Sequence, residues 1–139
     1  MDVVGLGVVG LGVDIVEVER IERAIQRWGD AFVRRIYTPG EIEHSAAPVV
    51  LGPRLAARFA AKEAVMKALG VGWRALAWRE IEIANDADGR PVVHLHGAAR
   101  RIATERGVVD VYVALAHTHD HAVANAVAVG TIGEQIRSK

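Results

Sequence analysis

Three charged residues of the segment "RFAAKEAVMKALG" have a spacing that could hold a phosphate. Lys62 projects from the middle of an apolar helical stripe, Glu63 lies at the edge of that stripe, and Lys67 follows Glu63 by one turn. A lysine among core-facing residues is costly unless its ammonium group reaches water or meets an anion. The stripe consists of Leu55, Phe59, Met66 and Leu69.

Two interpretations of these charges remain open. In the first, Glu63 and Lys67 form an exposed ion pair of the i, i+4 type, and Lys62 extends its ammonium group to solvent. In the second, Lys62 and Lys67 bind phosphate oxygens beside a Glu63 carboxylate that binds a metal ion. The second interpretation requires another oxygen ligand nearby.

Asp14 can supply that ligand. It ends a glycine-lined strand face in the segment "GLGVVGLGVD". Magnesium takes oxygen ligands and is commonly bound by one or two carboxylates together with substrate phosphates. Asp14 on a strand and Glu63 on an adjacent helix would therefore form a minimal Mg²⁺ site.

The glycines before Asp14 match the phosphate-binding pattern G-x-G-x-x-G at Gly5, Gly7 and Gly10. That pattern works only where a strand leads into the glycines and a helix begins on them. Here too few residues precede Gly5, and the residues that follow alternate with the period of a strand. We therefore expect a strand face that a backbone or a ligand can approach closely, and no dinucleotide site.

The segment "HTHDH" places His117, His119 and His121 around Asp120. It is one residue short of the H-x-H-x-D-H zinc motif of metallo-hydrolases, and three interpretations remain open: exposed turn residues, a zinc hydrolase, or a functional His117 alone. His117 shares its strand face with the apolar residues before it, so it stands where a buried face ends.

A basic stripe runs along the segment from residue 18 to residue 28. Arg20, Arg23 and Arg27 are spaced i, i+3 and i+7, roughly opposite the apolar residues of the same helix. The stripe is either a solvated helix face or a docking surface for an acidic partner.

The elements that must position these residues follow from hydrophobic periodicity. We expect a first strand ending near Asp14, a helix over residues 18–28 that stops at Gly29, and a turn at residues 38–40. The strongest helix runs from about Arg54 to a C-terminal stop at Gly70. Two short strands flank a turn at residues 86–90, a short helix follows over residues 98–106, and two alternating segments close the chain as a hairpin. This order predicts an α+β fold, a small antiparallel sheet packed with helices.

Composition indicates one domain over residues 1–139, with residues 1–8 as a possible extension and residues 131–139 as a tail. The charges balance at 17 basic and 17 acidic residues, which argues against binding to nucleic acid or to a membrane surface. Cysteine is absent, which excludes disulfides and fits a reducing compartment. The apolar N-terminal segment has no basic leader and is interrupted by Asp14, so we expect a soluble, cytoplasmic protein.

Four segments, in order, resemble the small bacterial holo-acyl-carrier-protein synthases, a family of 4'-phosphopantetheinyl transferases. "GLGVDIVEVERI" is similar to the opening of these proteins, and "RFAAKEAVMKALG" resembles their most diagnostic segment, Phe-Ala-x-Lys-Glu-x-x-x-Lys-Ala. "IEIANDADGRP" and "VALAHTHDHAVANAV" resemble their glycine-proline turn and closing histidine hairpin. The resemblance covers residues 9 to 129.

The resemblance implies an enzyme of fatty acid biosynthesis that transfers the 4'-phosphopantetheine arm of coenzyme A to a serine of an apo acyl carrier protein and releases adenosine 3',5'-bisphosphate. It implies a homotrimer with sites between subunits, and Mg²⁺ bound by Asp14 and Glu63. Catalysis would then depend on Asp14, Glu63 and Lys67, and the carrier protein would bind Arg20, Arg23 and Arg27. The coenzyme A contacts would be Lys62, Lys67, Gly70, Gly89, Pro91, His117 and Thr118.

The sequence departs from the family at the closing hairpin. Ala114 and Ala116 stand where the family usually has serine or threonine, and His121 stands where tyrosine is frequent. These departures motivate an alternative function, a catalytically silent relative that binds carrier protein or nucleotide.

Overall fold

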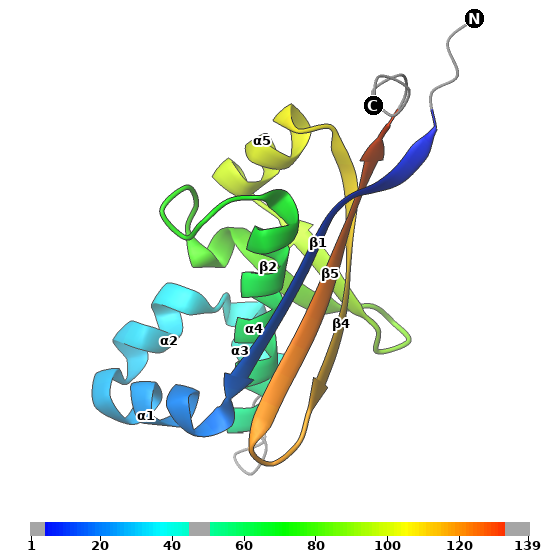
Figure 1. The fold of residues 1–139 in the computed structure, drawn as a ribbon. Helices are drawn as coiled ribbons and strands as arrows, with labels where there is room; N and C mark the ends of the chain where they lie inside the picture. Colours follow the sequence, from blue (N-terminus) through cyan, green and yellow to red (C-terminus); the bar gives the residue numbers. More distant parts are fainter. Residues whose placement is uncertain (1–4, 45–50, 133–139) are drawn as a thin grey trace, which may run out of the picture.

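The computed structural model describes residues 5–44 and 51–132. Its chain order is β1 (Leu6–Glu17), α1 (Val18–Trp28), α2 (Asp30–Ile36), α3 (Pro39–His44), α4 (Leu51–Leu69), η2 (Trp78–Glu80), β2 (Ile81–Asn85), β3 (Pro91–Leu95), α5 (Gly97–Glu105), β4 (Val108–His117) and β5 (His121–Thr131). The α+β class with small antiparallel sheets and packed helices is confirmed (Figure 1).

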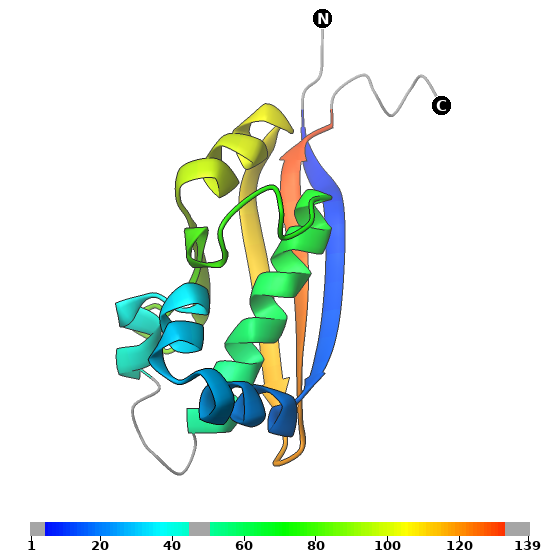
Figure 2. The same ribbon diagram turned by 90° about the vertical axis from the view of Figure 1, so that its left-hand side faces the viewer.

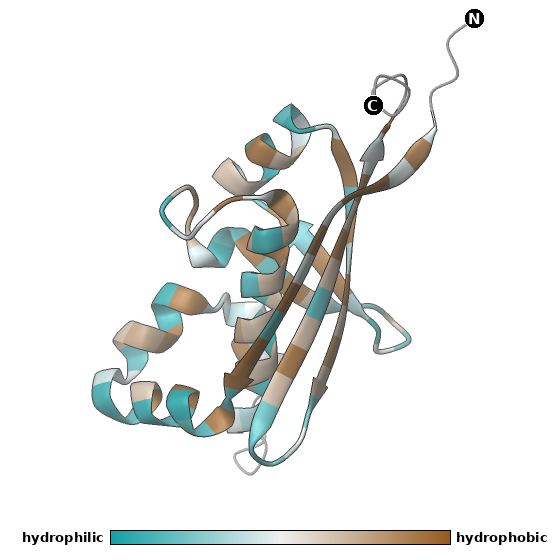
Figure 3. Ribbon diagram, viewed as in Figure 1, coloured by the Kyte–Doolittle hydropathy of each residue, from teal (hydrophilic) through white to brown (hydrophobic). Residues whose placement is uncertain are grey.

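One sheet holds three long antiparallel strands in the order β1-β5-β4, and a second sheet pairs β2 with β3. The long helix α4 lies along one face of the three-stranded sheet, and the other helices lie on that same side (Figure 2). Among the described elements, no helix lies on the second face of this sheet (Figures 1 and 2). Figure 3 shows that its strands carry many apolar residues. The molecule is therefore built in two layers, with its core between α4 and the sheet.

Small residues allow α4 to pack closely on the sheet. A Cβ atom on Gly10 would overlap the carbonyl oxygen of Ala68, and one on Gly12 would overlap that of Ala64. The sequence predicted that a backbone or ligand approaches these glycines, and the structure shows that the backbone of α4 does so. The central strand β5 faces the helix with four buried alanines, Ala122, Ala124, Ala126 and Ala128.

Two short helices lie between α1 and α4, where the sequence predicted none. The predicted stop at Gly29 is confirmed, because α1 ends at Trp28 and Gly29 caps it with φ of 57°, and the chain then forms the separate helix α2 from Asp30. The turn expected at Thr38-Pro39-Gly40 is instead the start of α3, because Pro39 occupies the first helical position, where its missing N–H costs nothing. These two short helices had no apolar period long enough to predict them.

Residues 6–8 of the possible extension belong to β1 and pair with Thr131, Gly130 and Val129 of β5. Residues 1–4 and most of the predicted tail lie outside the described residues. Within residues 5–44 and 51–132, no helix is long and apolar enough to cross a membrane.

Candidate active site

The close packing of α4 on β1 brings Lys67 against the strand residue Asp14. The Lys67 ammonium group donates to the backbone carbonyl of Val13 at 2.9 Å and lies 3.4 Å from the Asp14 carboxylate. The Lys67 side chain is 52% exposed and that of Asp14 is 19% exposed. Lys67 is therefore held in place by the strand while its ammonium group still reaches solvent.

Glu63 completes this cluster from the same face of α4. Burial raises the pKa of Glu63, and the neighbouring Asp14 carboxylate raises it further, while Lys67 and Arg20 oppose the shift. Glu63 and Lys67 are one helical turn apart on the same face of α4, and Lys67 contacts Asp14, so the three side chains border one site. Two carboxylates that repel each other across a partly open site are a suitable ligand pair for a hard divalent cation, so these residues fit Mg²⁺.

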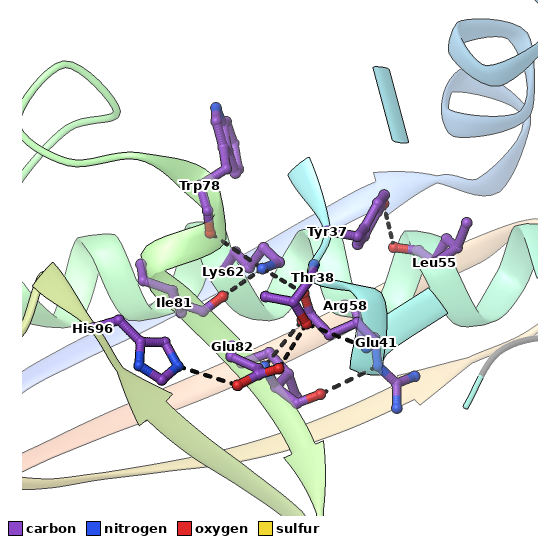
Figure 4. A network of polar contacts seen from close by, with 11 residues as sticks. Tyr37, Thr38, Glu41, Leu55, Arg58, Lys62, Trp78, Ile81, Glu82 and His96 are labelled. Atoms are coloured by element: carbon purple, nitrogen blue, oxygen red, sulfur yellow. Dashed lines mark hydrogen bonds and ion pairs between the residues drawn. The ribbon is translucent and has the colours of Figure 1, made fainter. Parts of the chain in front are cut away.

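Lys62 faces away from this cluster and is fully buried. Its ammonium group is 2.8 Å from the Glu41 carboxylate and donates to the backbone carbonyls of Trp78, at 3.1 Å, and Ile81 (Figure 4). All three of its donors are occupied inside the protein. Lys62 neither extends to water nor is free to bind a phosphate, so both interpretations of this residue need correction.

A cavity of about 500 Å³ joins three residues predicted for the nucleotide. It is lined by Gly89 and Pro91 from the turn after β2 and by His117 at the end of β4. Arg54 and Arg58 of α4 line it as well, and sequence reasoning missed both. Arg58 donates to the Asn85 side chain at 2.8 Å and to the carbonyl of Ile83. The missed signal was their four-residue spacing, which continues the helix face of Lys62 toward the N-terminus of α4.

Two other predicted coenzyme A contacts have local structural roles. The Thr118 hydroxyl accepts hydrogen bonds from the backbone N–H groups of Asp120 and His121, so it stabilises the hairpin turn. Gly70 ends α4 with φ of 75°, and its carbonyl accepts a hydrogen bond from Arg106. Neither residue lines the cavity that Gly89, Pro91 and His117 share.

The "HTHDH" segment is an exposed hairpin turn. His119 is 98% exposed, and its ring lies 3.1 Å from the Asp120 carboxylate. Among the residues that the structure describes, no three histidine, cysteine or acidic side chains gather where they could hold a metal ion. The described geometry thus gives a zinc hydrolase no support.

The basic stripe of α1 is exposed along its length. Arg23 lies 2.6 Å from Glu19, and the Arg27 guanidinium packs 4.9 Å from the centre of the Trp28 ring. Arg20, whose charge acts on Glu63, connects the stripe to the Asp14 cluster.

Comparison with known proteins identifies the family. The model of the 4'-phosphopantetheinyl transferase superfamily matches residues 10–126. The chain belongs to this superfamily. The resemblance read from the sequence is confirmed, and so is the enzyme class that it implied, a phosphopantetheinyl transferase.

The superfamily relatives cover nearly the whole chain. A holo-[acyl-carrier-protein] synthase of Solibacter usitatus is 50% identical over 112 residues, which are 80% of this chain and 90% of that protein. One of Moorella thermoacetica is 45% identical over 124 residues, 89% of this chain and 96% of that protein.

Solved transferase structures share the fold. The holo-[acyl-carrier-protein] synthase of Neisseria meningitidis superposes with a TM-score of 0.80 at 37% identity, covering 88% of this chain and 98% of that one. The Helicobacter pylori synthase, solved in complex with coenzyme A, superposes with a TM-score of 0.75 at 28% identity, covering 85% and 98%.

Proposed function

We propose that this phosphopantetheinyl transferase moves the 4'-phosphopantetheine arm of coenzyme A to a serine of an apo acyl carrier protein, at a magnesium site formed by Asp14 and Glu63. The observation that supports this most strongly is the cluster of Asp14, Glu63 and Lys67, two carboxylates and a cation brought together by the packing of α4 on β1. The relatives named holo-[acyl-carrier-protein] synthase supply the substrates.

The reaction is a phosphoryl transfer that depends on charge neutralisation and alignment. The serine oxygen forms a bond to the phosphorus attached to pantetheine, the bond from that phosphorus to the bridging oxygen of the pyrophosphate breaks, and adenosine 3',5'-bisphosphate leaves. Bound Mg²⁺ would neutralise pyrophosphate charge and stabilise the leaving group. Lys67 would neutralise a phosphate oxygen, since the Val13 carbonyl aims its ammonium group at the site. Glu63 is a candidate acceptor for the serine proton, because its carboxylate belongs to the same cluster as Asp14 and Lys67.

The nucleotide end of coenzyme A would occupy the cavity of about 500 Å³ beside α4. Arg54 and Arg58 give it a positive wall, as the 3'-phosphate requires, and His117 lies at its rim with Gly89 and Pro91. The two arginines would therefore contact coenzyme A. Lys62 would not, because its ammonium group is bound to the Glu41 carboxylate.

The carrier protein would dock on Arg20, Arg23 and Arg27. Charge reversal of Arg20 and Arg27 should weaken carrier binding by about tenfold or more and leave coenzyme A affinity unchanged, because rim charges contribute mainly to association with an oppositely charged partner. Surface plasmon resonance with apo carrier protein, beside calorimetry with coenzyme A, checks both affinities. Equal losses would assign the stripe a structural role.

A homotrimer with sites between subunits would cover the second face of the sheet. Leu11, Val13 and Ile15 of β1 are 69%, 57% and 66% exposed there, and Tyr112 of β4 lies on the same side. Apolar patches of this extent mark protein interfaces. Leu11→Lys should therefore convert a trimer to monomers in analytical ultracentrifugation, and a wild-type monomer would contradict this assembly.

A catalytically silent relative is the alternative function. Ala114 and Ala116 motivate it, but both are exposed on the sheet face opposite the one that His117 shares with Val111. Within one chain, hydroxyl groups at those two positions could not orient His117. The alternative therefore rests on hydroxyl groups of a neighbouring subunit, because the proposed trimer would cover this same face.

Intact mass spectrometry tests the proposed reaction. Apo acyl carrier protein is incubated with this protein, coenzyme A and Mg²⁺, and a parallel sample contains EDTA. We expect the carrier to gain one phosphopantetheine arm only without the chelator. No gain across several carrier proteins, with folded enzyme confirmed by circular dichroism, would favour the silent relative, and a gain that persists in EDTA would overturn the magnesium assignment.

A further inference from the structure

The pair of Glu41 and Lys62 is the most completely buried ionic contact among the described residues, and the proposed reaction does not use it. Both side chains are 0% exposed, and their charged atoms are 2.8 Å apart. Removing two charges from water is costly, and their mutual attraction inside the protein often does no more than offset that cost. A well-packed apolar pair would serve folding equally well, so the retained charges call for a specific explanation.

Glu41 links three elements through both of its carboxylate oxygens. Oε1 accepts from the backbone N–H of Thr38 at 2.8 Å and from Lys62, and Oε2 accepts from the backbone N–H of Ile83 at 3.0 Å. Thr38 continues the network by donating from its hydroxyl to Glu82 at 2.6 Å (Figure 4). The start of α3, the middle of α4 and strand β2 are thereby fixed to one carboxylate.

Lys62 connects this network of hydrogen bonds to α4. Its three donors are fixed by Glu41, Trp78 and Ile81, so the side chain has one permitted direction. Glu63 is the next residue, about 100° further around the helix. On the other side, α4 packs on Gly10 and Gly12 of β1 with no space for a Cβ atom between them, so a rotation that turned larger side chains of α4 toward these glycines would produce a clash. The rotation of α4 is therefore fixed from both sides.

We propose that Glu41 and Lys62 are positioning residues of the transfer reaction: their buried ion pair fixes the rotation of α4 and thereby the placement of Glu63 and Lys67 against Asp14. This inference rests on the proposed magnesium site. Of the two lysines in the "KEAVMK" segment, Lys62 then orients the site, and only Lys67 binds a phosphate.

Three variants and one control test this role. Lys62→Met and Glu41→Gln each remove one charge at nearly constant size, and the double variant neutralises the pair without leaving a lone buried charge, which favours its folding. Arg101→Met is the control, because Arg101 belongs to an exposed pair on α5 at 3.8 Å from Glu105. Each protein is assayed well below its own unfolding temperature.

Two readouts separate positioning from phosphate binding. The first is the Mg²⁺ concentration that gives half-maximal transfer, which should rise by about tenfold or more in all three variants, as when residues that orient a metal ligand are lost. The double variant should match the single ones, because the pair acts as one unit. The second is coenzyme A affinity without metal, measured by calorimetry, which should match the wild type. Arg101→Met should leave both unchanged.

Two results would overturn the inference. If Lys62→Met weakens metal-free coenzyme A binding and Glu41→Gln does not, Lys62 binds phosphate. If the folded variants keep the wild-type Mg²⁺ requirement, the pair serves folding alone. A wild type that transfers equally well in EDTA would instead refute the proposed magnesium site, so the two failures are distinguishable.

Discussion

Two lysines of α4, five residues apart, lie in opposite surroundings. Lys62 is sealed between α3, η2 and β2, and burial lowers its pKa while Glu41 opposes that shift. Lys67 lies on the β1 side, half-exposed, 3.4 Å from Asp14. Both lysines belong to the same motif and the same helix, so neither fact explains the difference. The side chains and backbone groups around each lysine decide whether its ammonium group can contact a substrate.

The largest expected effect concerns stability and separates the two lysines directly. Lys62→Met should lower the free energy of unfolding by about 3–5 kcal/mol, because it leaves the Glu41 carboxylate buried without its partner. Lys67→Met should change it by less than about 1 kcal/mol, since its ion pair is largely solvated. Urea denaturation measures both values, and equal losses would contradict the contrast between the two lysines.

The next largest effect concerns the partly exposed cluster of Asp14, Glu63 and Lys67. Glu63→Ala should lower kcat/KM for transfer by about 10³-fold with folding retained, because it removes a metal ligand and a candidate proton acceptor. Glu105→Ala, which alters an exposed glutamate of α5, is the matched control. Initial rates with apo carrier protein measure the effect. Unchanged turnover in Glu63→Ala would refute the metal assignment.

Lys67→Met should have a smaller kinetic effect, about 10²-fold in kcat/KM, because one of several phosphate-neutralising charges is lost while Asp14 and Glu63 remain. The loss should appear in transfer assays at saturating Mg²⁺. A variant as active as the wild type would remove Lys67 from the site and leave the phosphates to Arg54 and Arg58.

The smallest expected effect is a pH dependence of stability without metal. The pKa of Glu63 is raised in the folded protein by burial and by Asp14. A carboxyl group with a raised folded pKa binds more protons when folded, so its contribution to stability is complete below the unfolded pKa and is lost as pH rises through the folded pKa. The wild type should therefore lose stability relative to Glu63→Gln over that window. Urea unfolding over a pH series measures this, and parallel curves would contradict it.

The sequence predicted the partly exposed cluster around Asp14 better than the buried pair of Glu41 and Lys62. Asp14, Glu63 and Lys67 could be found because a glycine-lined strand face and a long helix each have a clear period, and the structure brings them together. Lys62 was misread because its partner Glu41 lies in α3, a short helix that the sequence did not predict and whose first two residues it assigned to a turn. Periodicity describes one element at a time, so it cannot supply a partner 21 residues away.

The outer sheet face shows the same limit. Alternation placed Leu11, Val13 and Ile15 on one side of β1, but alternation alone does not tell which side meets the helix. The glycines decide it, because only their face lets the α4 backbone approach, and the apolar residues are thereby turned outward. Arg54 and Arg58 were overlooked for a related reason, since the cavity that they line needs β2, β4 and α4 together.

A crystal structure of the protein with coenzyme A and Mg²⁺ tests the central claim most directly. We expect a metal ion within about 2.1 Å of carboxylate oxygens of Asp14 and Glu63. The Lys67 ammonium group should contact the pyrophosphate, and the Lys62 ammonium group should stay on Glu41. A Lys62 that contacts a phosphate, or a metal ion bound away from Asp14 and Glu63, would contradict the account.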